Sequence, residues 1–334
     1  MEKVYKLDKL DKKILHELDK NSRIPASKLA KKLKISREVA DYRIKRLIEH
    51  KIIRSFFTHI HSEKLGFTNY EVYFKTKGMG KEEEGKLIEF FCRHDMVFQV
   101  ISCDGAYDLI VHLVERDIYK LNAIIQECLH SYGHFFISKD ITLITKLLHC
   151  NKKFLLDKNN SYPEPTVYGI KKGFMEIDSK DKESLRLLSN NSRMQATEIA
   201  GKLGLTSAAV IYRIKELENK KIIDGYSCAI NAPRLGLAYC KVMLVLDFGN
   251  TIRERELHQF CLQHLNVTRF LYCIGHWDFE IDVMMDSMQD FHKFLKELKG
   301  RFSEIIRDYE YVTISESHKF MHFIEAYKSN IDYF

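Results

Sequence analysis

The tetrapeptide Tyr42-Arg43-Ile44-Lys45 occurs twice in this chain of 334 residues, the second time as Tyr212-Arg213-Ile214-Lys215. Residues 11–55 and 181–225 align around it without a gap and are identical at 19 of 45 positions. A repeat with one fixed offset over this length indicates an internal duplication. The sequence therefore predicts two copies of a unit of about 150 residues, fused in one polypeptide.

Each copy begins with a pattern typical of three short helices followed by a strand. In the first copy, apolar residues recur at helical spacing over residues 8–18, 26–33 and 37–50. Lys34-Ile35-Ser36 forms a tight turn before the third helix, and Ser36 is a suitable N-cap. The second copy has Gly204-Leu205-Thr206 at this turn. With an apolar strand after the third helix as a wing, each copy is predicted to form a winged helix-turn-helix.

The remainder of each copy alternates strands and helices in the order βαββαβ, which is the ferredoxin-like plan. We therefore expect an α+β fold, two copies of a winged helix-turn-helix followed by a ferredoxin-like domain. The expected boundaries are winged helix-turn-helix domains at 1–60 and 173–230, ferredoxin-like domains at 61–150 and 231–318, a linker at 151–172 and a C-terminal tail, helical or frayed, at 319–334.

Net charge is concentrated in the two N-terminal modules. Residues 1–60 carry 17 Lys and Arg against 8 Asp and Glu, which gives +9, and residues 170–230 carry 11 against 8, which gives +3. Residues 61–150 and 231–334 each have a net charge of −3. This distribution favours N-terminal modules that bind a polyanion, followed by domains with a different function.

The sequence contains no signal for several other classes of protein. No apolar run approaches a membrane span, and the N-terminus lacks the apolar core of a secretory signal, so we expect a cytoplasmic protein without a membrane partner. The eight cysteines include no CxxC pair, and no phosphate-binding loop or nucleophile elbow is present. We expect no catalytic residues, no metal and no cofactor.

The order and spacing of the motifs resemble the Lrp/AsnC family of transcription regulators, also called feast/famine regulators. The resemblance rests on Asp8-x-x-Asp11-x-x-Ile14-Leu15, on Asn21-Ser22-Arg23, and on Arg43-Ile44 followed by Leu47 and Lys51-Ile52-Ile53. It covers nearly the whole chain, twice. The family's units usually stand alone and dimerise, so this chain departs from the pattern by supplying both halves of a pseudo-dimer. The resemblance implies a sequence-specific DNA-binding regulator with ferredoxin-like sensing and oligomerisation domains, and higher homo-oligomers through these domains are possible.

By this resemblance, the third helix of each copy enters the major groove of double-stranded DNA. Arg43 and Arg213 would anchor phosphates, although an intramolecular ion pair, for example of Arg43 with Glu49, is the alternative. Arg37 can bind guanine and Glu38 can accept from cytosine, whereas Ser207 and Ala208 offer little, so the copies should read different half-sites. The candidate DNA-binding residues are Ser36, Arg37, Glu38, Tyr42, Arg43, Lys45, Arg46, Thr206, Ser207, Ala208, Tyr212, Arg213 and Lys215.

The resemblance also implies a small effector, usually an amino acid, near a Gly-x-x-Asp turn of the sensing domain. The candidate effector-binding residues are Gly105, Tyr107, Asp108, Gly275, Trp277 and Asp278. A hairpin that needs only a glycine and a capping aspartate is the alternative for these turns. The competing function is a siroheme decarboxylase, a tetrapyrrole enzyme that is similar to this family in fold. Its His-x-Tyr-Asn type of pattern is replaced here by Gly-Ala-Tyr-Asp and Gly-His-Trp-Asp.

Overall fold

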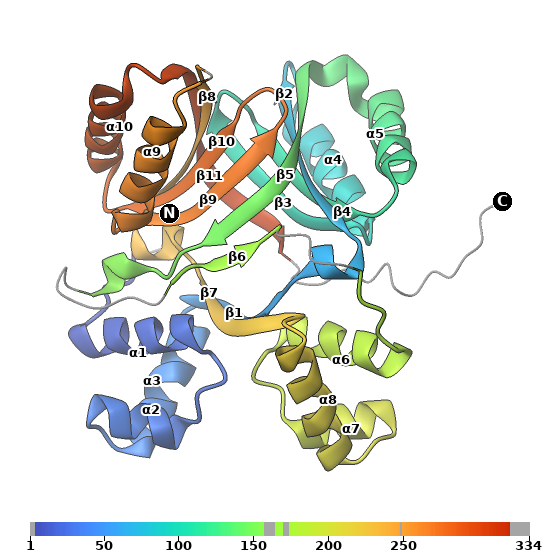
Figure 1. Ribbon diagram of the computed structural model, residues 1–334, viewed down its shortest axis with the longest axis vertical. Helices are drawn as coiled ribbons and strands as arrows, with labels where there is room; N and C mark the ends of the chain where they lie inside the picture. The colour runs from blue at the N-terminus through green and yellow to red at the C-terminus, as the bar shows by residue number, and fades with distance from the viewer. Residues whose placement is uncertain (1–3, 157–163, 170–173, 248, 321–334) are drawn as a thin grey trace.

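Two helical heads lie below one β-barrel (Figure 1). The computed structural model describes residues 4–156, 164–169, 174–247 and 249–320. The first head consists of α1 (Lys9–Lys20), α2 (Ala26–Leu33) and α3 (Arg37–Glu49), and the second of α6 (Ser179–Asn190), α7 (Ala196–Leu203) and α8 (Ser207–Asn219). Each head has a separate apolar core, to which Ile14, Leu18 and Leu47 belong in the first and Leu185, Leu188 and Leu217 in the second. The predicted three-helix order is confirmed in both copies.

The strand that follows each head pairs with its counterpart in the other copy. β1 (Ile53–Ile60) and β7 (Ile223–Ile230) form a two-stranded antiparallel ribbon, which we call the ribbon, in which Ile53 faces Ile230 and Ile60 faces Ile223. The strand that was expected as a wing after each third helix is therefore present. Its backbone groups need a partner, and the equivalent strand of the other copy provides it.

The two ferredoxin-like domains merge into one closed barrel of eight antiparallel strands. The strands are β2 (Thr68–Thr76), β3 (Val97–Gly105), β4 (Leu109–Glu115), β5 (Phe136–His149), β8 (Ala238–Leu246), β9 (Val267–Ile274), β10 (Phe279–Met285) and β11 (Ile306–Phe320). Their order is β2-β4-β3-β11-β8-β10-β9-β5, and β5 closes the ring on β2. The two long strands are shared, since β5 pairs with β2 and then with β9, and β11 pairs with β8 and then with β3.

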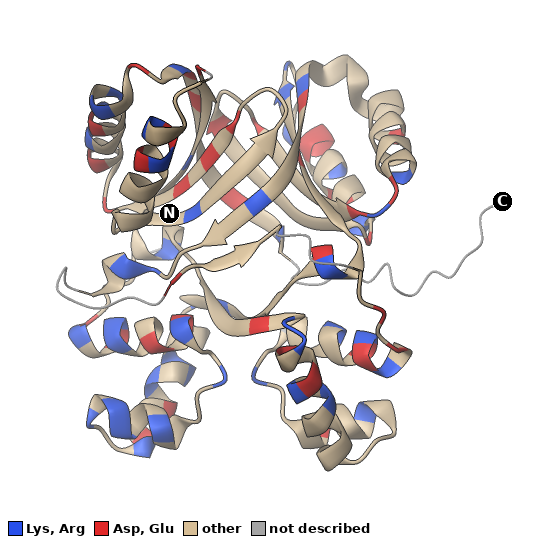
Figure 2. Cartoon of the chain, in the orientation of Figure 1, with Lys and Arg blue, Asp and Glu red and all other residues tan. Residues whose placement is uncertain are grey.

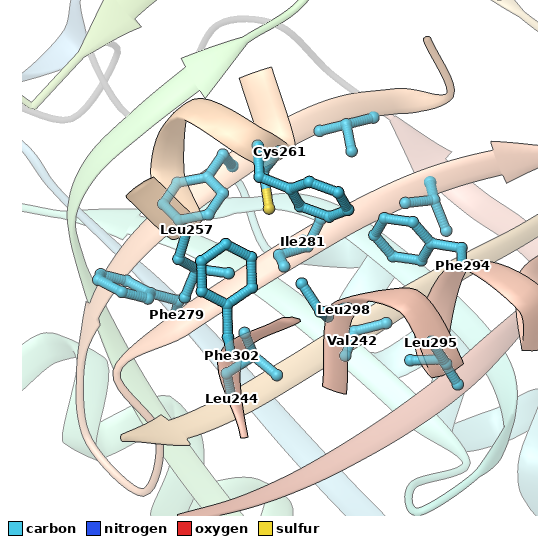
Figure 3. Close-up of a cluster of buried hydrophobic side chains, with 14 of the residues drawn as sticks. Val242, Leu244, Leu257, Cys261, Phe279, Ile281, Phe294, Leu295, Leu298 and Phe302 are labelled. Atoms are coloured by element: carbon cyan, nitrogen blue, oxygen red, sulfur yellow. The ribbon is translucent and has the colours of Figure 1, made fainter. Parts of the chain in front are cut away.

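Helices cover the outside of the barrel, and side-chain alternation along the strands separates an outer core from an inner one. The covering helices are α4 (Lys81–Arg93), α5 (Ile118–Tyr132), α9 (Thr251–Gln263) and α10 (Met288–Phe302). Figure 3 shows the outer core of the second copy, where Leu244 and Ile281 of the strands meet Leu257, Leu298 and Phe302 of the helices. Short 3-10 turns lie at Ser62–Leu65, Gly133–Phe135, Lys153–Leu155 and Pro233–Leu235.

The inside of the barrel holds a buried charge cluster that joins the two copies. Glu71 and Lys241 occupy equivalent positions of the repeat, and Glu71 Oε2 lies 2.5 Å from Lys241 Nζ. Lys241 also contacts Glu280, and Glu280 Oε1 accepts a hydrogen bond of 2.7 Å from Trp277 Nε1. Two identical units would place like charges at this contact, so the fused chain permits a pairing that a symmetric dimer of either unit does not.

Two segments outside the predicted domains are more structured than the sequence suggested. Within the expected linker, β6 (Thr166–Tyr168) pairs with β5, and Lys152 is buried with its backbone N–H 2.8 Å from Asp19 Oδ2. β11 continues to Phe320, two residues beyond the domain end expected at 318, because it pairs with β3 of the first copy as well as with β8. The rest of the expected tail, residues 321–334, lies outside the described residues.

Candidate nucleic-acid interface

The turn before the third helix of each head, which is the recognition helix, is formed by the residues that the sequence indicated. Lys34 ends α2 with a left-handed backbone (φ 56°), and Gly204 ends α7 in the same way (φ 62°). Ser36 then caps α3 by accepting from the N–H of Val39 at 3.2 Å, and Thr206 caps α8 by the same bond to Ala209. Both heads therefore carry the predicted helix-turn-helix geometry.

The outward face of α3 is polar and cationic, whereas that of α8 exposes Ile211 and Tyr212 beside polar residues and carries fewer cations. In α3 the side chains of Arg37 and Lys45 are 70% and 78% exposed, and Tyr42 is also exposed. The nearest acids, Asp41 and Glu49, lie 3.5 and 3.8 Å away as i,i+4 partners, so these cations are only loosely paired. None of the residues predicted to bind DNA is buried: Ser36, Arg37, Glu38, Tyr42, Lys45, Thr206, Ala208, Tyr212 and Lys215 are exposed, and Arg43, Arg46, Ser207 and Arg213 are half-buried. The copies thus present different surfaces at equivalent positions.

The arginine of each tetrapeptide binds acids of its own head. Arg43 Nη1 contacts Asp8 and lies 3.0 Å from Asp11 Oδ1, and Arg213 Nη1 lies 2.6 Å from Asp178 and 2.7 Å from Asp181. Hydrogen bonds to these carboxylates raise the pKa of both guanidinium groups.

The intramolecular ion pair that the sequence left open for Arg43 is therefore present, with Asp8 and Asp11 in place of Glu49. Arg46 is held in the same way, 2.9 Å from Asp11. These pairs fasten the recognition helix to the first helix of its head, which positions the exposed residues.

The Asn-Ser-Arg motif joins the two heads, a role that we did not assign to it from the sequence. Arg23 Nη1 donates to the carbonyl of Ser192 at 2.5 Å, and Arg193 Nη1 donates to the carbonyl of Ser22 at 2.6 Å. The Ser22 and Ser192 hydroxyls are buried and lie 2.6 Å apart. These reciprocal contacts, together with the pairing of β1 and β7 in the ribbon, set the separation of α3 and α8. The only sign of this contact in the sequence is the Ser-Arg pair that recurs at equivalent positions of the repeat.

The Gly-x-x-Asp turns lie where the two copies meet in the barrel. Tyr107 and Trp277 are 4% and 1% exposed and pack against the inner core. Asp108 accepts from the N–H of Thr76 at 2.7 Å, and Asp278 accepts from the N–H of Leu246 at 2.8 Å. Each aspartate therefore binds the backbone of a neighbouring strand, β2 or β8, and not that of its own turn.

The two turn glycines are required by a close approach between the copies. A Cβ on Gly105 would lie 2.6 Å from the carbonyl oxygen of Tyr311, and one on Gly275 would lie 2.8 Å from that of Ile141. Each turn therefore packs against the last strand of the other copy.

Lysine and arginine are denser on the first head than on the second (Figure 2). The sequence profile of the AsnC-type helix-turn-helix domain matches residues 7–48 and 177–218, which contain α1–α3 and α6–α8. An HTH-type transcriptional regulator of Pyrococcus horikoshii is 32% identical over 145 residues, which cover 42% of this chain and 96% of that protein. The chain belongs to the Lrp/AsnC family.

Other relatives support the same assignment. The regulator LrpA of Pyrococcus horikoshii is 50% identical over 98 residues, 29% of this chain and 66% of that protein. An HTH-type transcriptional regulator of Pyrococcus furiosus is 31% identical over 124 residues, 37% of this chain and 82% of that protein. This Lrp/AsnC protein is accordingly a DNA-binding transcription regulator, and it carries the family's DNA-binding domain twice.

A likeness over nearly the whole chain comes from the siroheme decarboxylase NirDL. Its crystal structure superposes with a TM-score of 0.61 at 13% identity and covers 95% of this chain and 94% of that chain. At this identity the likeness concerns the fold, namely the paired arrangement of two units. In the part of the chain that the structure describes, no helix is long and apolar enough to cross a membrane.

Proposed function

We propose that α3 and α8 of one chain bind two neighbouring half-sites of double-stranded DNA, and that the half-sites differ in sequence. The observation that carries this proposal is the reciprocal contact of Arg23 and Arg193, which fixes two exposed recognition helices relative to one another. Helix-turn-helix pairs read half-sites about one DNA turn apart, roughly 34 Å, or a multiple of it.

The first half-site is read by charged residues of α3. Arg37 is exposed and can bind the O6 and N7 atoms of guanine, and Glu38 can accept from the amino group of cytosine. In α8, Ser207 and Ala208 provide only a hydroxyl and a methyl contact. We therefore expect stricter base preference at the half-site bound by α3.

Phosphate contacts fall to exposed lysines and, in part, to the tetrapeptide arginines. Lys45 and Lys215 are exposed at equivalent positions. Arg43 and Arg213 have 21% and 27% of their side chains exposed, so each can reach a phosphate while it remains bound to its acids. Neutralising about six phosphates gives a slope of log K against log salt near −5.

The test compares two exposed arginines that have nearly the same surroundings. Arg37 and Arg93 are 70% and 73% exposed and are each paired with an acid one helical turn away, but Arg93 lies on α4 of the barrel. Arg37→Ala should weaken binding of a selected oligonucleotide by about 1–3 kcal/mol, whereas Arg93→Ala should change it by less than twofold in fluorescence anisotropy. Equal effects of the two substitutions would contradict the proposed role of α3.

We propose regulation rather than catalysis for this chain, acting in the cytoplasm and modulated by a small effector. The turn residues Tyr107 and Trp277 are buried and pack inside the barrel, which favours a structural role for them over that of a tetrapyrrole site. Incubation of the pure protein with siroheme should release no carbon dioxide. Release at a rate proportional to protein concentration would favour the decarboxylase.

An amino-acid effector at the Gly105 and Gly275 turns and a higher homo-oligomer stay predictions. Because the eight barrel strands form a closed ring, further assembly would use the outer helices rather than a strand edge of this ring. Light scattering that gives 39.4 kDa, the mass of one chain, at all concentrations would contradict assembly.

A further inference from the structure

A large, partly open cavity lies between the ribbon and the barrel. Its volume is about 670 Å³, within the range of small-molecule sites. Phe57 of the ribbon and Phe98 and Phe320 of the barrel line it, with ring centroids of neighbouring pairs 6.2–6.3 Å apart. These edge-on rings form an apolar wall suited to an aromatic body.

The cavity straddles the pseudo-twofold axis that relates the two copies. Equivalent positions of the repeat line it from both sides, as Ile60 and Ile230 do. Other equivalent positions carry different residues. Gln99 corresponds to Arg269, and both line the cavity, whereas His112, which lines it, corresponds to Asp282, which does not. Because the two copies share this cavity and its walls differ, it can hold one asymmetric ligand in a single orientation. A dimer of identical units would have equal walls and would not favour one orientation.

Two buried acceptors on the wall have no hydrogen-bond partner among the described residues. Gln99 is 6% exposed and its Oε1 is unpaired. His112 is 5% exposed, its Nε2 lies 3.2 Å from Asn69 Oδ1, and its Nδ1 makes no hydrogen bond and lies 3.9 Å from Glu71 Oε1. Burial lowers the pKa of His112 to about 4, so the ring is neutral and an Nε2–H that donates to Asn69 leaves Nδ1 as an acceptor. Buried unpaired acceptors are rare and indicate a missing donor.

Arg54 gives the cavity a cation that is not neutralised by a close acid. Lys152, Arg234 and Arg269 also line it, and of these Lys152 and Arg269 are bound to Asp19 and Asp282. Arg54 forms no ion pair within 4 Å among the described residues, and the charge of Glu316, the only acid among the residues that line the cavity, acts on it from farther away. A guanidinium in this position favours an anionic group on the ligand.

We propose that this cavity binds one small aromatic anion per chain, which also carries an N–H or O–H donor for Gln99 or His112. The aromatic wall takes the ring system, Arg54 takes the anionic group, and the unpaired acceptors take the donor. None of the residues at the Gly-x-x-Asp turns belongs to this site.

The position of the site connects it to the DNA-binding heads. β1 begins four residues after the end of α3, and β7 begins four residues after the end of α8, so the ribbon that roofs the cavity continues both recognition helices. A ligand that moves the ribbon relative to the barrel would change the separation of α3 and α8. This regulatory consequence rests on the proposed function, whereas the binding site itself does not.

The test uses 1-anilinonaphthalene-8-sulfonate as the probe, because it has aromatic rings, an N–H donor and an anionic group. In the absence of DNA, its fluorescence should rise on titration with the full chain and saturate at one probe per chain. Ser317→Phe should abolish this binding by filling the cavity, since Ser317 lines it and its hydroxyl has no partner. Ser317→Ala, which removes the same hydroxyl without adding volume, should leave binding intact.

A second pair of variants tests the anionic contact. Arg54→Ala should weaken binding of the probe about tenfold, whereas Arg255→Ala, an exposed arginine of α9 away from the cavity, should not change it. N-phenyl-1-naphthylamine, which lacks the sulfonate, should bind wild type and Arg54→Ala equally. Unchanged binding of the sulfonate to Ser317→Phe, or binding that appears only in a chain shortened to Phe320, would overturn the proposal. Because DNA is absent, a failure of DNA binding would leave this result unaffected.

Discussion

Removal of the lysine at the centre of the barrel should cost a large part of the stability of this domain. Lys241 is 1% exposed, and its ammonium lies between the carboxylates of Glu71 and Glu280, with Asp282 Oδ1 3.7 Å away. Burial alone would lower the pKa of Lys241, but the neighbouring carboxylates hold this pKa well above its usual range. In Lys241→Met, two buried carboxylates lose their common cation, and breaking a buried pair in this way costs about 3–5 kcal/mol.

The assay is urea unfolding followed by the fluorescence of Trp277, the only tryptophan, which donates a hydrogen bond to Glu280. Lys241→Met should lower the free energy of unfolding by about 3–5 kcal/mol at pH 8, and by less at pH 5, where the carboxylates can bind protons instead. Lys215→Met, an exposed lysine of α8, should change it by less than about 0.5 kcal/mol.

The triple variant Glu71→Leu, Lys241→Met, Glu280→Gln separates a lost charge pair from a packing defect. It removes the unpaired charges together with the cation, so most of the lost stability should return. A loss below about 1 kcal/mol in the single variant, or a triple variant no more stable than the single one, would refute the electrostatic reasoning.

Three further predictions follow from named contacts. Burial and the charge of Glu71 raise the pKa of Glu280 from 4.5 to about 7, so between these pH values the folded state binds more protons than the unfolded state. The free energy of unfolding, measured by urea titration, should therefore fall as the pH rises from 4.5 to about 7, and Glu280→Gln should abolish this fall. Gly105→Ala places a Cβ 2.6 Å from a carbonyl oxygen at a φ of 129° and should destabilise the protein by about 2–4 kcal/mol in thermal unfolding. In the same assay Gly201→Ala in α7, where no other atom lies within 4 Å of the added Cβ, should stabilise the protein by about 0.5–1 kcal/mol. Arg193→Ala should weaken DNA binding without changing its salt dependence, because Arg193 holds the other head and not a phosphate, whereas Lys45→Ala should reduce the salt slope by about 1.

The local elements could be predicted from the sequence because their signals are local. Helical periodicity placed the three helices of each head, and the capping residues Ser36 and Thr206 marked where the recognition helices begin. The constant offset of the repeat indicated the duplication, and the alternation of strands and helices predicted the ferredoxin-like order. The outward position of Arg37, Tyr42 and Lys45 also followed from spacing alone.

The contacts between the two copies could not be predicted in this way, because they join residues far apart in the chain. An apolar strand after α3 is consistent with a wing or with the ribbon, and only its pairing distinguishes the two. Tyr107 and Trp277 look like walls of a binding site in the sequence, but the closure of the barrel buries them. The partners of Arg43 were ambiguous because several acids lie within its reach, and the capping aspartate of α1 proved to be one of them.

The central claim, that two unlike recognition helices in one chain bind neighbouring half-sites, is tested most directly by selecting bound duplexes from a random DNA pool. We predict an enriched sequence with two different half-sites about 10 base pairs apart or at a multiple of that spacing, in which Arg37→Ala relaxes the preference at one half-site only. A single half-site, a perfect palindrome or no enrichment in low salt would contradict the claim.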